Sequence, residues 1–119
     1  VERGGDTEIT KIARRSQTVK RAMPKILRER QALRPVQTAQ GRKLRATAVC
    51  KPLGAKGRLH RQAACRVVIR KGVPTLLLDS KRALRVRVTQ RAKGSKRLLP
   101  FTRSADYRYR PKASAARRI

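Results

Sequence analysis

The excess of positive charge constrains this chain more than any other feature. Its 119 residues include 34 Lys and Arg against 6 Asp and Glu, so the formal net charge is +28. Self-repulsion of that size opposes a compact state in isolation, and a polyanionic partner would remove the penalty. Between Gln31 and Leu78 there is no acidic residue at all, whereas ordinary solvated surfaces intersperse charges of both signs. The charge balance therefore predicts a surface that faces phosphate.

The length allows one domain, and the ends of the chain are rich in Pro, Gly and Arg. About the middle half is left to build a core, which is small for independent stability. We expect three parts: a basic N-terminal arm over 1–40, a small β domain over 41–103 and a basic C-terminal tail over 104–119.

Between Gly41 and Thr102 the sequence alternates apolar and polar residues in short segments that turn residues separate. This alternation is typical of half-buried strands, and Gly72 with Pro74 indicates a hairpin turn. Five short strands with turns favour a small barrel over a helical bundle. The fold prediction is therefore mainly β. The expected strands cover Lys43–Cys50, Arg66–Arg70, Pro74–Asp79, Ala83–Val88 and, as a candidate, Arg97–Phe101.

The segment ALRVRVTQ, Ala83–Gln90, places Leu84, Val86 and Val88 on one side and two arginines on the other. Alternate residues of a strand point to opposite faces, so Arg85 and Arg87 should point outward. Phosphates along an RNA backbone would offset their mutual repulsion, and arginine can hold a phosphate with two hydrogen bonds. The alternative is that these cations protect an edge strand from aggregation.

The two arms carry weaker signals. Acidic residues precede a dense basic run near the N-terminus, which predicts a short helix over about Thr10–Ala22 that Pro24 ends or kinks. Its apolar stripe is thin, so the arm is either ordered by its partner or solvated and disordered. After Phe101 the tail loses β character, and residues 113–119 form a short helix or stay extended. Tyr107 and Tyr109 alternate with arginines and either stack on exposed bases or pack on the barrel.

Catalytic and metal chemistry is poorly represented. Cys50 and Cys65 with His60 between them offer too few ligands for zinc. We expect both cysteines to be small buried apolar residues in a reducing compartment, and a thiolate–histidine pair lacks an orienting acid. The segment GAKGRL lacks the spacing of a phosphate-binding loop. The prediction is a protein that is not an enzyme and has no cofactor, metal or small-molecule substrate.

The chain has three aromatic residues and no Trp. This argues against a protein that binds single-stranded nucleic acid, because such proteins stack the bases on aromatic side chains. No apolar run approaches the ~20 residues of a membrane span, so we expect no membrane partner. A basic protein with few aromatic residues is expected instead to recognise phosphates and the shape of a groove. The long loop over Cys50–Cys65, with Gly54 and Gly57 for tight turns, is suited to entering an RNA groove; the alternative is a mobile solvated loop.

Several segments resemble a known family. MPKIL (23–27) and RPV (34–36) precede RKLRAT (42–47), KGRLHR (56–61), CRVV (65–68), LLLD (76–79) and LRVRVTQR (84–91), followed by Lys96. Their order and spacing are similar to those of the eukaryote-specific large-subunit ribosomal protein six, whose fold is a KOW-type, SH3-like barrel. The chain departs from the family at RQAAC (61–65), where a KOW motif normally has a second glycine.

The resemblance implies a structural role on the ribosomal RNA of the large subunit, with neighbouring ribosomal proteins as further partners. Basic residues of loops, strand faces and arms are the expected contacts. The candidate RNA-binding residues are Arg42, Lys43, Arg45, Lys51, Lys56, Arg58, His60, Arg61, Arg85, Arg87, Arg91, Lys93, Lys96, Arg97, Arg108 and Arg110.

Two other function classes stay open at the level of sequence. One is a DNA-compacting protein of histone or protamine type, against which the β pattern argues. The other is an organellar ribosomal protein, whose leader would precede Val1. The expected location is the cytoplasmic ribosome with nucleolar assembly. An interaction module for acidic proteins is a weaker alternative, because the charge exceeds what ordinary protein surfaces can match.

Overall fold

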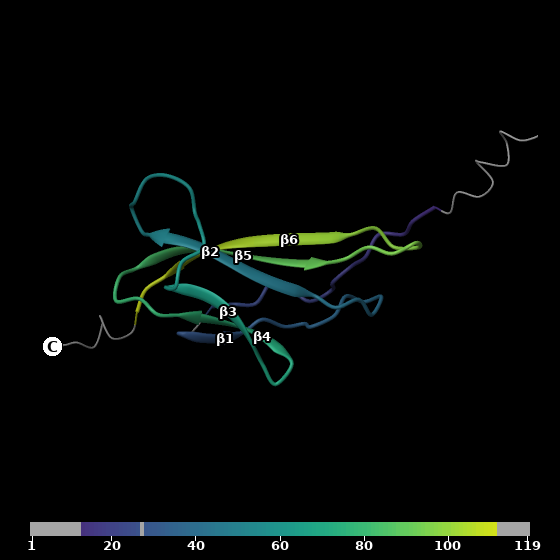
Figure 1. Cartoon of the computed structure of the whole chain (residues 1–119), viewed down its shortest axis with the longest axis horizontal. Coiled ribbons are helices and arrows are strands. Elements are labelled where there is room, and N and C mark those ends of the chain that lie inside the picture. Colours follow the sequence, from purple (N-terminus) through teal and green to yellow (C-terminus); the bar gives the residue numbers. More distant parts are fainter. Residues whose placement is uncertain (1–12, 27, 112–119) are drawn as a thin grey trace, which may run out of the picture.

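The computed structural model describes residues 13–26 and 28–111. Over these residues the protein is mainly β, as predicted, and it has no helix. The strands are β1 (Arg30–Ala32), β2 (Arg45–Pro52), β3 (Cys65–Arg70), β4 (Val73–Leu78), β5 (Leu84–Ala92) and β6 (Phe101–Tyr109). They form two antiparallel three-stranded sheets with the orders β1-β4-β3 and β2-β5-β6. In Figure 1 the β2-β5-β6 sheet lies above the β1-β4-β3 sheet.

The β2-β5-β6 sheet has the longer strands, and its central strand shows the predicted alternation. Leu84, Val86 and Val88 are buried, whereas Arg85 and Arg87 are exposed. β5 pairs with β2 on one side and β6 on the other. The alternative that these arginines protect an edge strand is therefore wrong, because β5 has no free edge to protect over its paired residues.

The second sheet is built on the predicted hairpin. β3 and β4 pair from Cys65 with Leu78 to Arg70 with Val73, and the turn between them is Lys71-Gly72. Both turn residues have positive φ, 51° and 77°, as a type I′ turn requires. Pro74 lies near the start of β4, as expected. The short strand β1 then pairs with the other edge of β4, and the sequence pattern did not reveal it.

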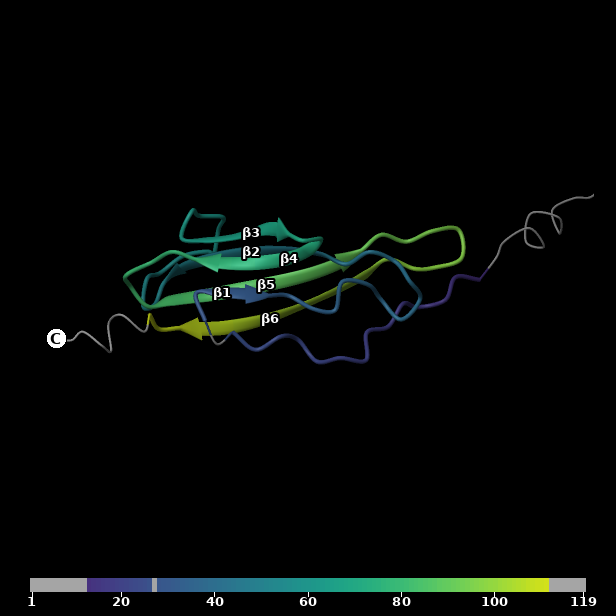
Figure 2. The ribbon, with the colours of Figure 1, turned by 90° about the horizontal axis from the view of Figure 1, so that it is seen from below.

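The core lies between the two sheets. Its buried side chains come from the inner faces of both sheets and from the segment after β1; they are Leu33, Ala48, Cys50, Cys65, Leu76, Leu78, Leu84, Val86, Val88 and Tyr109. Figure 2 shows the strands of both sheets running along the same long direction of the molecule.

The predicted barrel is not confirmed. Over the described residues the two sheets have no strand ladder in common, and each keeps two edge strands. β1 and β3 are the edges of one sheet, and β2 and β6 are the edges of the other. The architecture is therefore a pair of facing sheets rather than one closed sheet.

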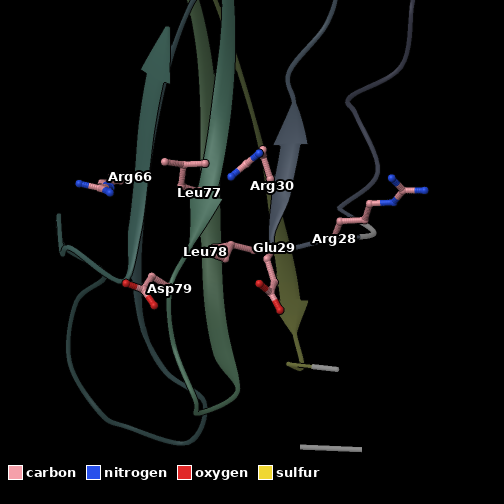
Figure 3. Close-up of a pocket in the computed structure, with 7 residues that line it drawn as sticks. All are labelled: Arg28, Glu29, Arg30, Arg66, Leu77, Leu78 and Asp79. Atoms are coloured by element: carbon pink, nitrogen blue, oxygen red, sulfur yellow. The ribbon is translucent and has the colours of Figure 1, made fainter. Parts of the chain in front are cut away.

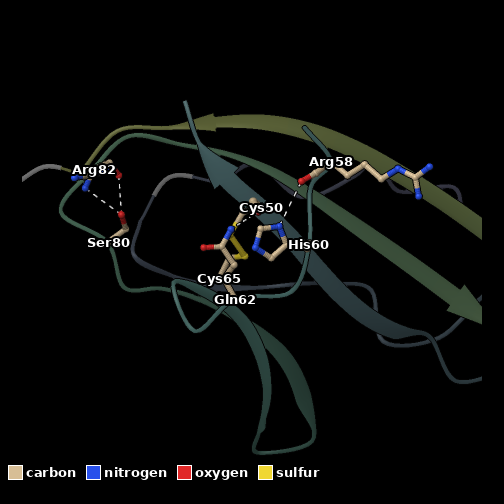
Figure 4. Close-up of a disulfide and its surroundings, with 7 residues drawn as sticks. All are labelled: Cys50, Arg58, His60, Gln62, Cys65, Ser80 and Arg82. Carbon is tan, nitrogen blue, oxygen red and sulfur yellow. Dashed lines mark hydrogen bonds between the residues drawn. A yellow bond between two sulfur atoms is a disulfide. The ribbon is translucent and has the colours of Figure 1, made fainter. Parts of the chain in front are cut away.

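The prediction of free cysteines is wrong. Cys50 and Cys65 are both buried, as expected, but they form a disulfide that joins β2 of one sheet to β3 of the other (Figure 4). The backbone of His60 pairs with that of Cys50 through two hydrogen bonds, and Gln62 Nε2 donates to Cys50 O at 2.6 Å. The loop thus folds back on the end of β2 and brings the two sulfurs together.

The predicted helix over Thr10–Ala22 is also wrong for the part that the structure describes. Residues 13–22 contain no helix. The backbone of Arg15 instead forms hydrogen bonds with Arg97 and Leu99, and Arg103 Nη1 donates to Arg21 O at 2.6 Å. The apolar stripe was too narrow to hold a helix against the core, so contacts with the rest of the chain determine the backbone. Residues 10–12 of that prediction lie outside the described residues.

The C-terminal part of the β region differs from prediction as well. Residues 97–100 belong to the connection between β5 and β6 rather than to a strand, and β6 continues from Phe101 to Tyr109, where a loss of β character was predicted. Pro100 cannot donate to a ladder, while β5 offers partners to every residue of β6. The helix predicted within 113–119 lies outside the described residues.

Candidate nucleic-acid interface

The outer face of the β2-β5-β6 sheet gathers many of the predicted cations. Strand pairing places the outward residues in four rows across the three strands. The rows are Lys51, Arg85 and Arg108; Val49, Arg87 and Asp106; Thr47, Thr89 and Ser104; and Arg45, Arg91 and Thr102. We call this surface the outer face. Six of its twelve positions are Lys or Arg and one is acidic, so its formal charge is positive.

Asp106 is the one acidic residue of the outer face, and its carboxylate accepts hydrogen bonds from two arginines. Arg87 Nε donates to Asp106 Oδ1 at 2.8 Å and Arg87 Nη2 donates to Oδ2 at 3.2 Å. Arg85 Nη2 reaches the same Oδ2 at 3.3 Å. The hydrogen bond from Arg87, with a smaller contribution from Arg85, lowers the pKa of Asp106. The carboxylate therefore stays charged near neutral pH and offsets part of the repulsion between its two neighbours.

One end of the outer face is hollowed. A cavity of about 460 Å³ lies there, lined by the first row, by Asp106 and Tyr107 of β6 and by the start of the loop after β2. Its residues are Lys51, Leu53, Gly54, Ala55, Arg85, Asp106, Tyr107 and Arg108. Three cationic side chains and one carboxylate share this space. Such a site can bind an anion of phosphate size through charge-assisted hydrogen bonds.

The opposite end has a second cavity of about 350 Å³. It is lined by Arg45, Thr47, Arg91, Ala92, Lys93, Pro100, Phe101 and Thr102. Here two arginines from neighbouring strands stand beside an aromatic ring. The arrangement offers positive charge for a phosphate next to an apolar surface for a sugar or a base.

Other predicted residues extend these two ends. The loop after β2 holds Lys56, Arg58, His60 and Arg61, all exposed, and Lys51 Nζ donates to Gly57 O at 2.6 Å, which ties the loop to the first row. Arg110 follows β6 at the same end. The β5–β6 connection holds Lys93, Lys96 and Arg97 at the opposite end, also exposed (Figure 1).

Arg42 and Lys43 precede β2. Lys43 is exposed, but Arg42 is half-buried and donates through Nε and Nη2 to Lys93 O and Gly94 O, both at 3.3 Å. The Arg42 guanidinium thus braces the β5–β6 connection, a role that sequence reasoning did not assign to it.

The two tyrosines pack on the protein, which was one of their two predicted uses. Tyr109 is buried in the core, and Tyr107 packs against the core and donates its hydroxyl to Pro24 O at 2.6 Å. Burial raises the pKa of both phenols. Neither ring lies on the outer face as a stacking platform, because both side chains point to the inner side of β6.

Sequence reasoning missed two features near the interface. Gln17 is 5% exposed; its side chain accepts from Thr38 Oγ1 and donates to Lys93 O and Leu99 O, so it anchors the N-terminal segment to the β5–β6 connection. The hydroxyl row of Thr47, Thr89 and Ser104 was also missed, and Thr89 Oγ1 lies 2.8 Å from Ser104 Oγ. Within β5 and β6, polar residues occupy every second position on the outer side, and this alternation was the sequence signal that could have revealed the row.

A third cavity, of about 630 Å³, lies over the β1-β4-β3 sheet and is lined by Arg28, Glu29, Arg30, Arg66, Leu77, Leu78 and Asp79. Figure 3 shows Arg30 and Arg66 on either side of Leu77, with Glu29 and Asp79 at one end. The two acids offset most of the positive charge of the three arginines. This cavity is therefore a weaker anion site than the outer face.

Among residues 13–26 and 28–111, no group of three or more His, Cys, Asp or Glu could hold a metal ion. The same described part of the chain has no helix long and apolar enough to cross a membrane. In comparisons with known proteins, no family model, no curated protein and no solved structure matched the chain.

Proposed function

We propose that this protein is a structural, rRNA-binding constituent of the large ribosomal subunit, which braces RNA through phosphate contacts. The observation that supports the proposal is the outer face, where strand pairing brings together cations that are far apart in the sequence. With a net charge of +28, condensed counterions released from RNA would dominate the affinity. The protein acts as a scaffold, without catalysis or a cofactor.

In this proposal the sheet is the anchor and the basic loops extend it. The loop after β2 and the β5–β6 connection reach RNA segments beyond the two ends of the outer face, and neighbouring ribosomal proteins contact the remaining surface. The predicted membership of the large-subunit protein six family, with its SH3-like barrel, belongs to the same proposal. It depends on the sequence segments described above.

The DNA-compacting alternative is less favoured by the fold. Proteins of that kind are usually helical or unstructured, whereas this chain has two sheets and, over the described residues, no helix. Along β5 its cations also alternate with core residues.

The proposed location is the cytoplasmic ribosome, with an organellar ribosome as the alternative. The Cys50–Cys65 disulfide favours neither by itself, but it weighs against the predicted reducing environment, because disulfides persist mainly in oxidising compartments. A test of location must therefore also record whether the two cysteines are bonded.

Fractionation of cells that produce the full-length protein tests the function. We expect the protein to sediment with large ribosomal subunits in a sucrose gradient, and to leave them when RNase digests the RNA or when high salt screens the phosphates. Alkylation of each fraction before and after reduction records the state of the cysteines. Recovery with chromatin, sensitive to DNase and not to RNase, would support the DNA-compacting alternative and overturn the proposal.

A further inference from the structure

The charge on the outer face is separated into two ends. The first row contributes three cations and the last row contributes two, whereas the third row has only hydroxyl groups. In the second row Asp106 pairs closely with Arg87 and, at a longer distance, reaches Arg85 of the first row. Arg85 and Arg91 mark the two ends on β5, and six residues of strand separate them by about 20 Å. A ligand that fits this face has negative charge at both ends and hydrogen-bonding groups without charge between them.

A single strand fits this pattern poorly. Proteins that bind single strands use a continuous basic groove with several aromatic platforms. The outer face instead has a neutral centre. Of the two aromatic residues that line its cavities, Phe101 lies at the last row, and Tyr107, at the first row, packs against the core. A duplex presents phosphates on both sides of a groove, which matches two separated cationic ends.

The size of the sheet distinguishes between the minor grooves of RNA and DNA duplexes. For the two charged ends to reach both lines of phosphates, the strands must cross the groove, so about 20 Å of sheet lies across it. The minor groove of B-DNA is only about 6 Å wide and about 7.5 Å deep, so the sheet cannot enter it. The minor groove of A-form RNA is wide and shallow and displays 2′-hydroxyl groups, so a sheet face can lie across it.

The third row supplies the matching chemistry. Thr47, Thr89 and Ser104 present hydroxyl groups side by side across the three strands, and a hydroxyl both donates and accepts hydrogen bonds. The 2′-hydroxyl of RNA does the same, and it is the group by which a protein distinguishes RNA from DNA. The row lies between the two charged ends, where the riboses of a duplex would lie between its two lines of phosphates.

We propose that the outer face binds across the shallow minor groove of an RNA duplex. The cations of the first and last rows contact phosphates of the two strands, and the hydroxyl row contacts 2′-hydroxyl groups between them. The inference rests on the proposed rRNA-binding function and specifies the form of RNA that the protein recognises.

The test compares the affinity of the full-length protein for three ligands of one sequence: an RNA duplex, a DNA duplex and a single-stranded RNA. Fluorescence anisotropy near 0.15 M salt, and over a salt series, gives the affinity and the slope of log K against log salt. We expect the RNA duplex to bind most tightly. The variant Thr47→Val, Thr89→Val, Ser104→Ala should reduce the preference for RNA over DNA about tenfold and leave the salt slope unchanged.

A second variant separates charge from hydroxyl contacts. Arg45→Gln with Arg91→Gln should flatten the salt slope by about 1.4 to 1.8, because two phosphates are no longer neutralised. The matched control is Arg66→Gln with Arg70→Gln, two exposed arginines of β3 on the other sheet; the slope should stay unchanged there. Thermal unfolding checks that each variant folds, and valine suits a strand position.

The outcomes separate the inference from the proposed function. Equal or tighter binding of single-stranded RNA or of the DNA duplex overturns the inference and leaves RNA binding intact. An unchanged RNA-to-DNA ratio in the folded hydroxyl variant overturns it as well. If the protein binds none of the three ligands, the proposed function itself is wrong.

Discussion

At the scale of single residues, Asp106 determines how much of the charge on the outer face is available. Its carboxylate accepts hydrogen bonds from Arg85 and Arg87, so a phosphate must replace it or bind beside it. We expect Asp106→Asn to raise the affinity for duplex RNA and to steepen the salt slope by about one, because two guanidinium groups lose a competing anion. Titrations of RNA over a salt series measure both quantities.

The matched control for that variant is Asp79→Asn, which makes the same charge change at an exposed residue after β4 on the other sheet. Equal effects of the two variants would show that net charge alone matters and that the pairing with Asp106 does not. The pKa of Asp106 is lowered in the folded protein, so its ion pair is complete above the ordinary pKa of about 3.9 and is lost as the pH falls through the lower, folded value. The difference between Asp106→Asn and the unmodified protein should therefore not change with pH near neutrality.

At the scale of elements, the disulfide joins the two sheets at the ends of one connection. Cys50 lies in β2 and Cys65 begins β3, 15 residues apart. A cross-link that closes a loop of this length typically contributes about 3 kcal/mol to the free energy of unfolding. We expect Cys50→Ala with Cys65→Ala to lower the urea midpoint accordingly, and reduction of the unmodified protein to have a similar effect. Identical midpoints for the oxidised and reduced protein would contradict this expectation.

At the scale of the whole molecule, stability and binding depend on the same excess of charge. With a net charge of +28, self-repulsion destabilises the isolated protein and salt screens that repulsion. We expect its Tm to rise with salt, whereas in complex with duplex RNA the Tm should be higher at low salt and fall as salt weakens binding. Differential scanning calorimetry measures both. An uncharged polymer in place of RNA is the control, and a Tm of the free protein that falls with salt would contradict the argument.

The sequence by itself determined the features that depend on neighbouring residues. The alternation of Leu84, Arg85, Val86 and Arg87 has the period of a strand, so β5 and the outward direction of its cations could be predicted. Gly72 likewise indicated the hairpin turn, because a type I′ turn requires positive φ. The surplus of cations indicated a polyanionic partner through composition alone, because unlike charge is needed to offset it, and this stays a prediction.

Only the tertiary structure decided which distant segments meet. Strand register places Arg45 opposite Arg91 and Arg87 opposite Asp106, and no local pattern encodes such pairings. The same holds for the disulfide, for β1 and for the extended path of residues 13–22, where contacts with the β5–β6 connection replaced the predicted helix. The local propensity of a segment for helix or strand is a weak preference, and tertiary hydrogen bonds and burial override it. The cations of the outer face could therefore be listed from the sequence, but their division into two charged ends and the hydroxyl row between them could not.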